Sequence, residues 1–103
     1  MPQPPLFEVH WTEPAQESMR RIYDWVSKHD YPENAASLVE RLFEAGDALE
    51  WSPQRYSPAP EWGEGVRRLP MLGHRILFEV DEAQRRVDIL DVVGGHENPR
   101  EVR

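Results

Sequence analysis

The hydrophobic pattern of the chain is clearest between Gly65 and Gly95, where it predicts three β-strands joined by two hairpin turns. In the middle strand apolar and polar residues alternate, as they do when only one face of a strand is buried. The buried face carries Ile76, Phe78 and Val80. The other face, which we expect to be free, carries Arg75, Leu77 and Glu79. The β-branched, apolar run at 87–93 predicts a central strand after it.

The residues before this block predict a short strand and two helices that cover its apolar face. Residues 6–11 alternate as a strand does. Residues 15–29 and 32–50 carry apolar residues at helical spacing. The link between them is short, so we expect an antiparallel helical hairpin. Residues 51–64 hold three prolines without any periodicity and predict a loop.

This order, β-α-α-β-β-β, predicts an α+β fold. An N-terminal strand and an antiparallel helical hairpin would pack on a small, mostly antiparallel β-sheet. A chain of 103 residues has room for one core, so we expect a single domain over residues 1–103. We expect the ends, residues 1–5 and 97–103, to be flexible.

The charge distribution argues against non-specific binding of nucleic acid. The net charge is −7, and residues 1–64 hold all of this excess, with five Lys/Arg against twelve Asp/Glu. Residues 65–103 hold seven of each, so their arginines are the expected polar working surface. Neutralised phosphates supply most of non-specific nucleic-acid affinity, which an acidic chain therefore opposes. Any action on nucleic acid would be local or supported by another macromolecule.

Composition also excludes several kinds of site. The chain has no cysteine, which excludes disulfides, thiolate metal ligands and cysteine nucleophiles. No apolar run approaches the about 20 residues of a membrane helix, and the N-terminal residues lack a secretion signal. His10, His74 and His96 match no metal-ligand spacing. We expect a cytoplasmic protein with no membrane contact, metal, cofactor or small-molecule substrate.

Short motifs follow one another in a characteristic order over nearly the whole chain. They are VHWT (9–12), IYDWV (22–26), PENAA (32–36), ALE (48–50), RRL (67–69), GHRILFEV (73–80), and VDILDVV (87–93) followed by His96. In this combination the chain resembles the RelE/ParE superfamily of bacterial type II toxins, and it is most similar to the ParE-like branch. The resemblance implies a sheet with a helical hairpin and neutralisation by a cognate antitoxin. It implies DNA gyrase as the target of ParE-like members, and mRNA on the ribosome for RelE-like members.

The resemblance also implies roles for single residues. Arg75 matches a strand arginine that contacts RNA in the RelE-like ribonucleases, and Arg68 matches a basic residue of the preceding strand. His96 stands where RelE has an arginine and some relatives a histidine. Val66 stands where RelE has a second lysine, and Val102 or a neighbour stands where RelE has a C-terminal tyrosine. Half of the basic cluster is thus replaced, which argues against ribonuclease activity.

Two readings of the arginines remain open. In a ribonuclease, Arg68, Arg75 and His96 would be catalytic, with His96 as the base and a guanidinium group stabilising the phosphate charge. In the alternative reading, Arg75 pairs with a carboxylate such as Glu79 or Asp88, and His96 is a solvated tail residue.

Binding surfaces are indicated by arginine and aromatic residues, which dominate the energetics of protein interfaces. A target-binding patch would comprise Trp62, Arg67, Arg68 and Arg75. Alternatively, Trp62 folds back over the edge of the sheet. An antitoxin helix in an apolar groove would contact Trp25, Tyr31 and Phe43.

Our first hypothesis is a ParE-like toxin that binds and poisons a macromolecular target such as DNA gyrase, without catalytic chemistry of its own. The alternative is a ribosome-dependent endoribonuclease of the RelE kind, in which the ribosome positions the mRNA. A third reading is a diverged member of the fold that only binds a protein partner.

Overall fold

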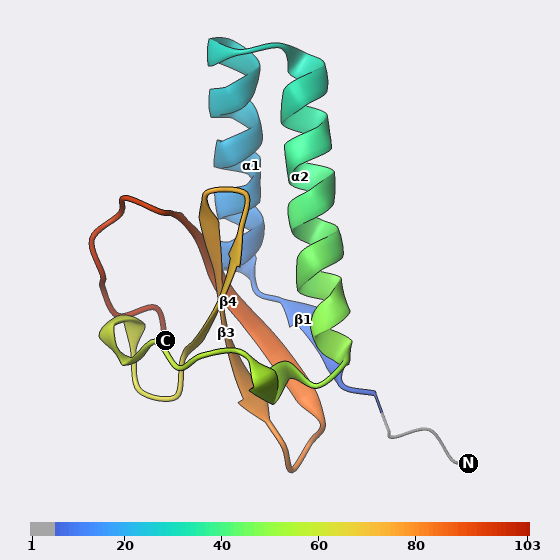
Figure 1. Cartoon of the computed structure of the whole chain (residues 1–103), viewed down its shortest axis with the longest axis vertical. Coiled ribbons are helices and arrows are strands. Elements are labelled where there is room, and N and C mark those ends of the chain that lie inside the picture. Colours follow the sequence, from blue (N-terminus) through green and yellow to red (C-terminus); the bar gives the residue numbers. More distant parts are fainter. Residues whose placement is uncertain (1–5) are drawn as a thin grey trace.

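The chain folds as a helical hairpin that stands beside and rises beyond a β-sheet (Figure 1). The computed structural model describes residues 6–103, so the expectation for residues 1–5 lies outside the described part. The element order is β-α-α-β-β-β, which confirms the predicted α+β fold. The elements are β1 (Glu8–Trp11), α1 (Glu13–His29), α2 (Pro32–Asp47), β2 (Arg67–Met71), β3 (His74–Asp81) and β4 (Arg86–Gly94).

The sheet is mixed, with the strand order β1-β4-β3-β2. The last three strands form the predicted antiparallel meander, and β1 pairs in parallel with β4. This places β4 in the middle of the sheet, as its apolar composition predicts. The ladder between β3 and β4 shifts where Leu77 pairs with Asp91 and Phe78 with Ile89, so Leu90 is the extra residue of a β-bulge.

Both helices have a proline in the first turn, Pro14 in α1 and Pro32 in α2, where a missing N–H has no cost. Each buries one stripe, which includes Met19 of α1 and Leu42 of α2. These side chains pack on the sheet face that carries Ile76 and Phe78, both 0% exposed. The predicted contact between the hairpin and the apolar face of β3 is confirmed. Each such side chain contributes about 1.5–3 kcal/mol when it is fully buried.

The opposite face of the sheet is covered as well, and our expectation that it is free is wrong. Leu77 of β3 is 0% exposed, and Leu90 and Val93 of β4 belong to the same cluster. A second core cluster forms on this face from Ala59, Trp62, Val66, Leu77, Leu90 and Val93. The cover comes from the loop before β2, which a backbone bond from Ala59 to the Val66 carbonyl closes (2.7 Å). The proline-rich loop is therefore part of the core.

The C-terminal tail folds back over the same face. Val102 packs against the second cluster, and its amide donates to the Trp62 carbonyl at 3.0 Å. Arg103 then forms an ion pair with Glu79 of β3 at 3.0 Å. Figure 1 shows this segment returning from the end of β4 to the loop before β2. The tail links elements that lie far apart in sequence.

Gly46 of α2 lies against the indole ring of Trp11, and a larger residue there should destabilise the fold. A Cβ atom at this position would come within 2.3 Å of the Trp11 ring and 2.9 Å of Ile89 Cδ1. We expect Gly46→Val to lower the free energy of unfolding by at least about 2 kcal/mol through overpacking. Urea denaturation measures the change. Ser37→Val, at an exposed site of the same helix, controls for helix propensity and should cost only about 0.5 kcal/mol or less.

Candidate functional site

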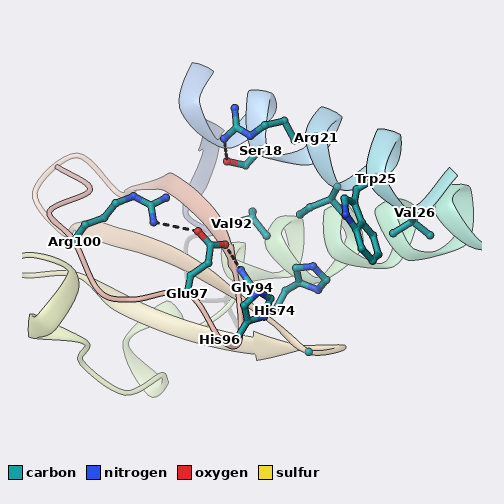
Figure 2. A pocket seen from close by; sticks show the side chains of 12 residues that line it. Ser18, Arg21, Trp25, Val26, His74, Val92, Gly94, His96, Glu97 and Arg100 are labelled. Carbon is teal, nitrogen blue, oxygen red and sulfur yellow. Dashed lines mark hydrogen bonds and ion pairs between the residues drawn. The ribbon is translucent and has the colours of Figure 1, made fainter. Parts of the chain in front are cut away.

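A cleft of about 500 Å³ opens between α1 and the end of the sheet where β4 passes into the tail (Figure 2). This volume is within the range of ligand-binding pockets. The α1 wall presents Ile22, Trp25 and Val26. The remaining lining comes from the turn between β2 and β3, from the end of β4 and from the tail, and includes His74, His96, Glu97 and Arg100.

A buried carboxylate, that of Asp91, binds three residues that line this cleft, Ser18, Val92 and Arg100. Asp91 is 8% exposed and lies at the bulge of β4. Its Oδ1 accepts hydrogen bonds from the Ser18 hydroxyl and from the Val92 amide, the latter at 2.8 Å. Its Oδ2 accepts a bond from Arg100 Nη2 at 3.0 Å. These bonds offset the cost of burying the charge and join α1, β4 and the tail.

Glu97 holds the beginning of the tail in place. Its Oε2 accepts a hydrogen bond from the Gly94 amide, and its Oε1 accepts one from Arg100 Nη1 at 3.1 Å. Figure 2 marks both interactions with dashed lines and shows Glu97 between Gly94 and Arg100. Burial by itself would raise the pKa of Glu97, but the Gly94 bond and the Arg100 guanidinium outweigh it and lower the pKa below its ordinary value of 4.5.

The lowered pKa of Glu97 predicts an acid-sensitive contribution to stability. Because the folded state holds the proton less tightly than the unfolded state, this contribution is present above the unfolded pKa. It is lost as the pH falls through the lower, folded pKa. We expect Glu97→Gln to cost about 0.5–1 kcal/mol at pH 7, as befits a partly exposed ion pair. The difference from the wild-type chain should shrink below pH 4.5, which urea denaturation at several pH values will show. A constant difference down to pH 3 would contradict this assignment.

The predicted arginines are held in different ways. Arg67 Nη1 donates to the backbone carbonyl of Tyr56 at 2.6 Å and to that of Gln54 at 3.2 Å, so it anchors the preceding loop. Arg68 Nη1 lies 3.9 Å from Glu61 Oε1, and its side chain is 42% exposed. Arg75 Nη2 donates to the Gly95 carbonyl at 3.0 Å.

The carboxylates considered as partners of Arg75 pair with other arginines. Glu79 binds Arg103, and Asp88 binds Arg86 at 3.2 Å. Because Arg68 pairs with Leu77 in the ladder and Arg75 with Pro70, the two arginines are diagonal neighbours on the face opposite the helices. His96 lies next to Gly95, the residue that Arg75 binds, and its imidazole packs against Gly94.

Trp62 is placed differently from the target-binding patch in which we included it. It is 1% exposed and lies inside the second core cluster, so its ring is not available for contact in this structure. The guanidinium group of Arg100 lies over the ring at 5.6 Å from its centre. Val66 is 1% exposed in the same cluster, and Val102 packs against it.

The residues expected to bind an antitoxin lie on separate parts of the helical hairpin. Trp25 lines the cleft beside α1 and is 61% exposed, while its ring stacks on His29 at 4.1 Å. Tyr31, at the tip of the hairpin, is 68% exposed. Phe43 is half-buried against the Trp11 ring and lines a second, more apolar groove of about 410 Å³ between the helices.

The network of hydrogen bonds and ion pairs at the cleft was not predicted from the sequence. Ser18, Asp91, Glu97 and Arg100 are joined only in three dimensions. One available signal was Asp91 itself, a carboxylate within the otherwise apolar stretch after Ile89. Such a residue must find hydrogen-bond partners when its strand is buried.

Two further features concern residues 6–103 only. In this part of the chain, no group of three His, Asp or Glu side chains is placed to hold a metal ion. No helix in it has the length and apolarity that crossing a membrane requires.

Comparison with known proteins places this fold. Among solved structures the chain is similar to the chromosomal ParDE toxin–antitoxin system from P. aeruginosa, with 22% identity, a TM-score of 0.74 and coverage of 88% of this chain and 98% of that chain. It is similar to the toxin–antitoxin complex RelBE2 from Mycobacterium tuberculosis, with 22% identity, a TM-score of 0.61 and coverage of 86% and 98%. A mutant of the E. coli toxin RelE in the free state gives 12% identity, a TM-score of 0.63 and coverage of 88% and 85%.

At these identities the structural similarities show the fold. No curated protein matches the chain significantly by sequence. The family model described as the ParE toxin of the type II toxin–antitoxin system parDE matches residues 9–99, which is most of the chain. The chain therefore belongs to the ParE toxin family, as its resemblance to the RelE/ParE superfamily predicted.

Proposed function

We propose that this protein is a toxin that inhibits DNA gyrase by binding it, and that a cognate antitoxin silences it. The match to the ParE toxin family over residues 9–99 carries the proposal. The resemblance noted above implies gyrase as the target of ParE-like members. The structures to which the chain is similar include a ParDE system and RelBE complexes of toxin with antitoxin.

The second core cluster supports a binding function over RNA cleavage. The resemblance aligns Val66 with a lysine of RelE, and Val102 or a neighbour with a tyrosine. Here both valines pack with Trp62 and Leu77 in an apolar cluster. A lysine in place of Val66, which is 1% exposed, would carry the cost of burying its charge. The net charge of −7 further opposes binding of RNA without help from another macromolecule.

The target-binding surface that we propose centres on Arg68 and Arg75. They lie on the same face of the neighbouring strands β2 and β3 and belong to the less acidic part of the chain. Arg67 contributes by holding the loop at 54–56 in place through its two carbonyl contacts. Trp62 contributes indirectly. It belongs to the same buried cluster as Leu77, and Leu77 pairs with Arg68 in the ladder between β2 and β3.

Two assays run in parallel test the proposed target. The purified chain is added to a gyrase supercoiling reaction and to a cell-free translation extract in which mRNA cleavage is followed. We expect inhibition of supercoiling with intact mRNA. Arg68→Ala should weaken this inhibition, while Arg20→Ala, an exposed arginine of α1, serves as the matched control. Cleavage of mRNA in the ribosomal A site would support the ribonuclease alternative, in which Arg68, Arg75 and His96 act on RNA.

For the antitoxin we propose a contact with Trp25 of α1 and Tyr31 at the tip of the hairpin, which are the most exposed large apolar residues among those described. Exposed aromatic residues of this size are typical of interface hot spots. Co-purification with the product of a neighbouring gene, and its loss in Trp25→Ala, would test this contact. Retention by Trp25→Ala together with loss by Phe43→Ala would move the contact to the groove between the helices.

A further inference from the structure

The central strand β4 is longer than the neighbour on its outer side. β1 pairs with β4 only from Arg86 to Ile89, and the Thr12 amide and hydroxyl then bind the Ile89 carbonyl as the chain turns into α1. β4 itself continues to Gly94. Among residues 6–103, its last residues therefore have β3 on one side and no strand on the other. This open edge, with Val92 and Gly94, lines the cleft beside α1.

Side chains of the protein itself occupy the amides of this edge. The Val92 amide donates to Asp91 Oδ1, and the Gly94 amide donates to Glu97 Oε2. Within a sheet, carbonyl groups of a neighbouring strand would accept these bonds. Carboxylates in this role are local substitutes for a missing strand, and they protect an edge from unwanted pairing. The edge can therefore accept main-chain carbonyls once Asp91 releases the Val92 amide and Glu97 releases the Gly94 amide.

The two walls of the cleft define what kind of segment would fit. On the α1 side, Ile22 and Val26 contribute apolar side chains to the lining, to which Val92 of β4 also belongs. The ionisable residues of the lining are mostly basic, in contrast to the chain as a whole with its net charge of −7. They are Arg21, His74, His96 and Arg100, against the single acidic residue Glu97.

We propose that this cleft binds an extended segment of the antitoxin, added as a short strand to the open edge of β4 in line with β1. Its main-chain carbonyls would take the Val92 and Gly94 amides, as in recognition by strand addition. Because side chains of a strand alternate, apolar residues would face Ile22 and Val26 of α1, and acidic residues would point to the opposite side, towards Arg100. Arg21 of α1 adds a further positive charge to the lining. The occupant is thus a segment in which apolar and acidic residues alternate. The inference rests on the proposed function, since it identifies the occupant as the antitoxin.

A synthetic peptide tests the site without the antitoxin itself. The probe is a blocked five-residue peptide that alternates valine and aspartate, titrated into the isotope-labelled full chain and followed by NMR. We expect shifts of the Val92 and Gly94 amide signals, and at least tenfold slower hydrogen exchange of both amides at saturation. The control peptide carries lysine in place of aspartate and should bind at least tenfold more weakly.

A matched pair of variants separates the cleft from the rest of α1. Arg21 and its neighbour Arg20 both pair with Glu17, but only Arg21 lines this cleft. Arg21→Glu should weaken peptide binding at least tenfold, and Arg20→Glu less than twofold. Circular dichroism confirms that both variants fold. Gly94→Pro, which removes one of the two donors, should also abolish the exchange protection of Val92.

Several results would overturn the inference. Shifts confined to the outer edge of β2 or to the groove at Phe43 would place the strand elsewhere, and equal binding of the lysine peptide would remove the charge argument. Absence of binding at millimolar peptide would refute the site. Shifts of Val92 and Gly94 on concentrating the chain alone would make a second copy the occupant. The gyrase assay contains no peptide, so peptide binding without gyrase inhibition would count against the proposed function alone.

Discussion

Replacing Trp62 with alanine is expected to lower the free energy of unfolding by about 3–5 kcal/mol. Trp62 is 1% exposed and holds the second core cluster together, where it packs with Leu77 and Val93. Its backbone carbonyl also accepts the hydrogen bond that fixes Val102 of the tail. Small domains are stable by only about 5–15 kcal/mol, so the variant would lose a large share of its stability. Urea denaturation of both chains at pH 7 measures the change.

Trp51→Ala is the matched control for this prediction. Trp51 precedes the same proline-rich loop, but its side chain is 42% exposed. Its removal should cost clearly less than that of Trp62, about 1 kcal/mol or less, because little buried volume is lost. Equal losses in the two variants would mean that the loop contributes little to the core. Trp62 would then return to the list of candidate contact residues.

The fold could be predicted largely from periodicity. The alternation of Ile76 and Phe78 identified the sheet face under the helices, and Pro32 marked the start of the second helix. These are local signals, since each depends on residues a few positions apart. The parallel pairing of β1 with β4 brings together residues almost eighty positions apart, as in the pair Val9–Val87. No local pattern encodes such a contact.

The second face of the sheet shows where periodicity fails. Leu77 was assigned to a free face because alternation separates faces but does not say how many are covered. The bulge at Leu90 then breaks the alternation of β4, so that face assignments after it cannot be read by counting. Trp62 lies in a loop without periodicity, and its burial depends on Leu77 and Val93, both distant in sequence.

The candidate site was predicted in part. Arg75 and His96 do lie at the same end of the sheet, because Arg75 binds Gly95. The residues that shape the cleft between them and α1 could not be found from spacing, since the ion pair of Arg100 with Asp91 depends on how the tail folds back. The tail carries no periodicity, so its path is decided by contacts with distant elements.

Arg75→Ala is expected to abolish growth inhibition while leaving the fold intact. The guanidinium group makes one hydrogen bond to the Gly95 carbonyl and lies on the face that we propose to contact the target. Loss of one such bond costs about 0.5–1.5 kcal/mol of stability. Loss of an arginine at an interface hot spot costs about 2–4 kcal/mol of binding, so inhibition of gyrase should weaken by about 30- to 700-fold. Supercoiling assays and urea denaturation on the same preparation measure both quantities.

Arg20→Ala is the matched control, because the guanidinium group of Arg20 also makes one hydrogen bond, to Glu17 Oε1 at 3.2 Å, on α1 and away from the proposed surface. It should lose a similar amount of stability and none of the inhibition. Arg75→Lys distinguishes charge from geometry, since lysine retains the positive charge without the planar donor group. If Arg75→Ala loses stability but inhibits gyrase as strongly as the wild-type chain, Arg75 only holds the turn at Gly95. The target-binding surface must then lie elsewhere on the molecule.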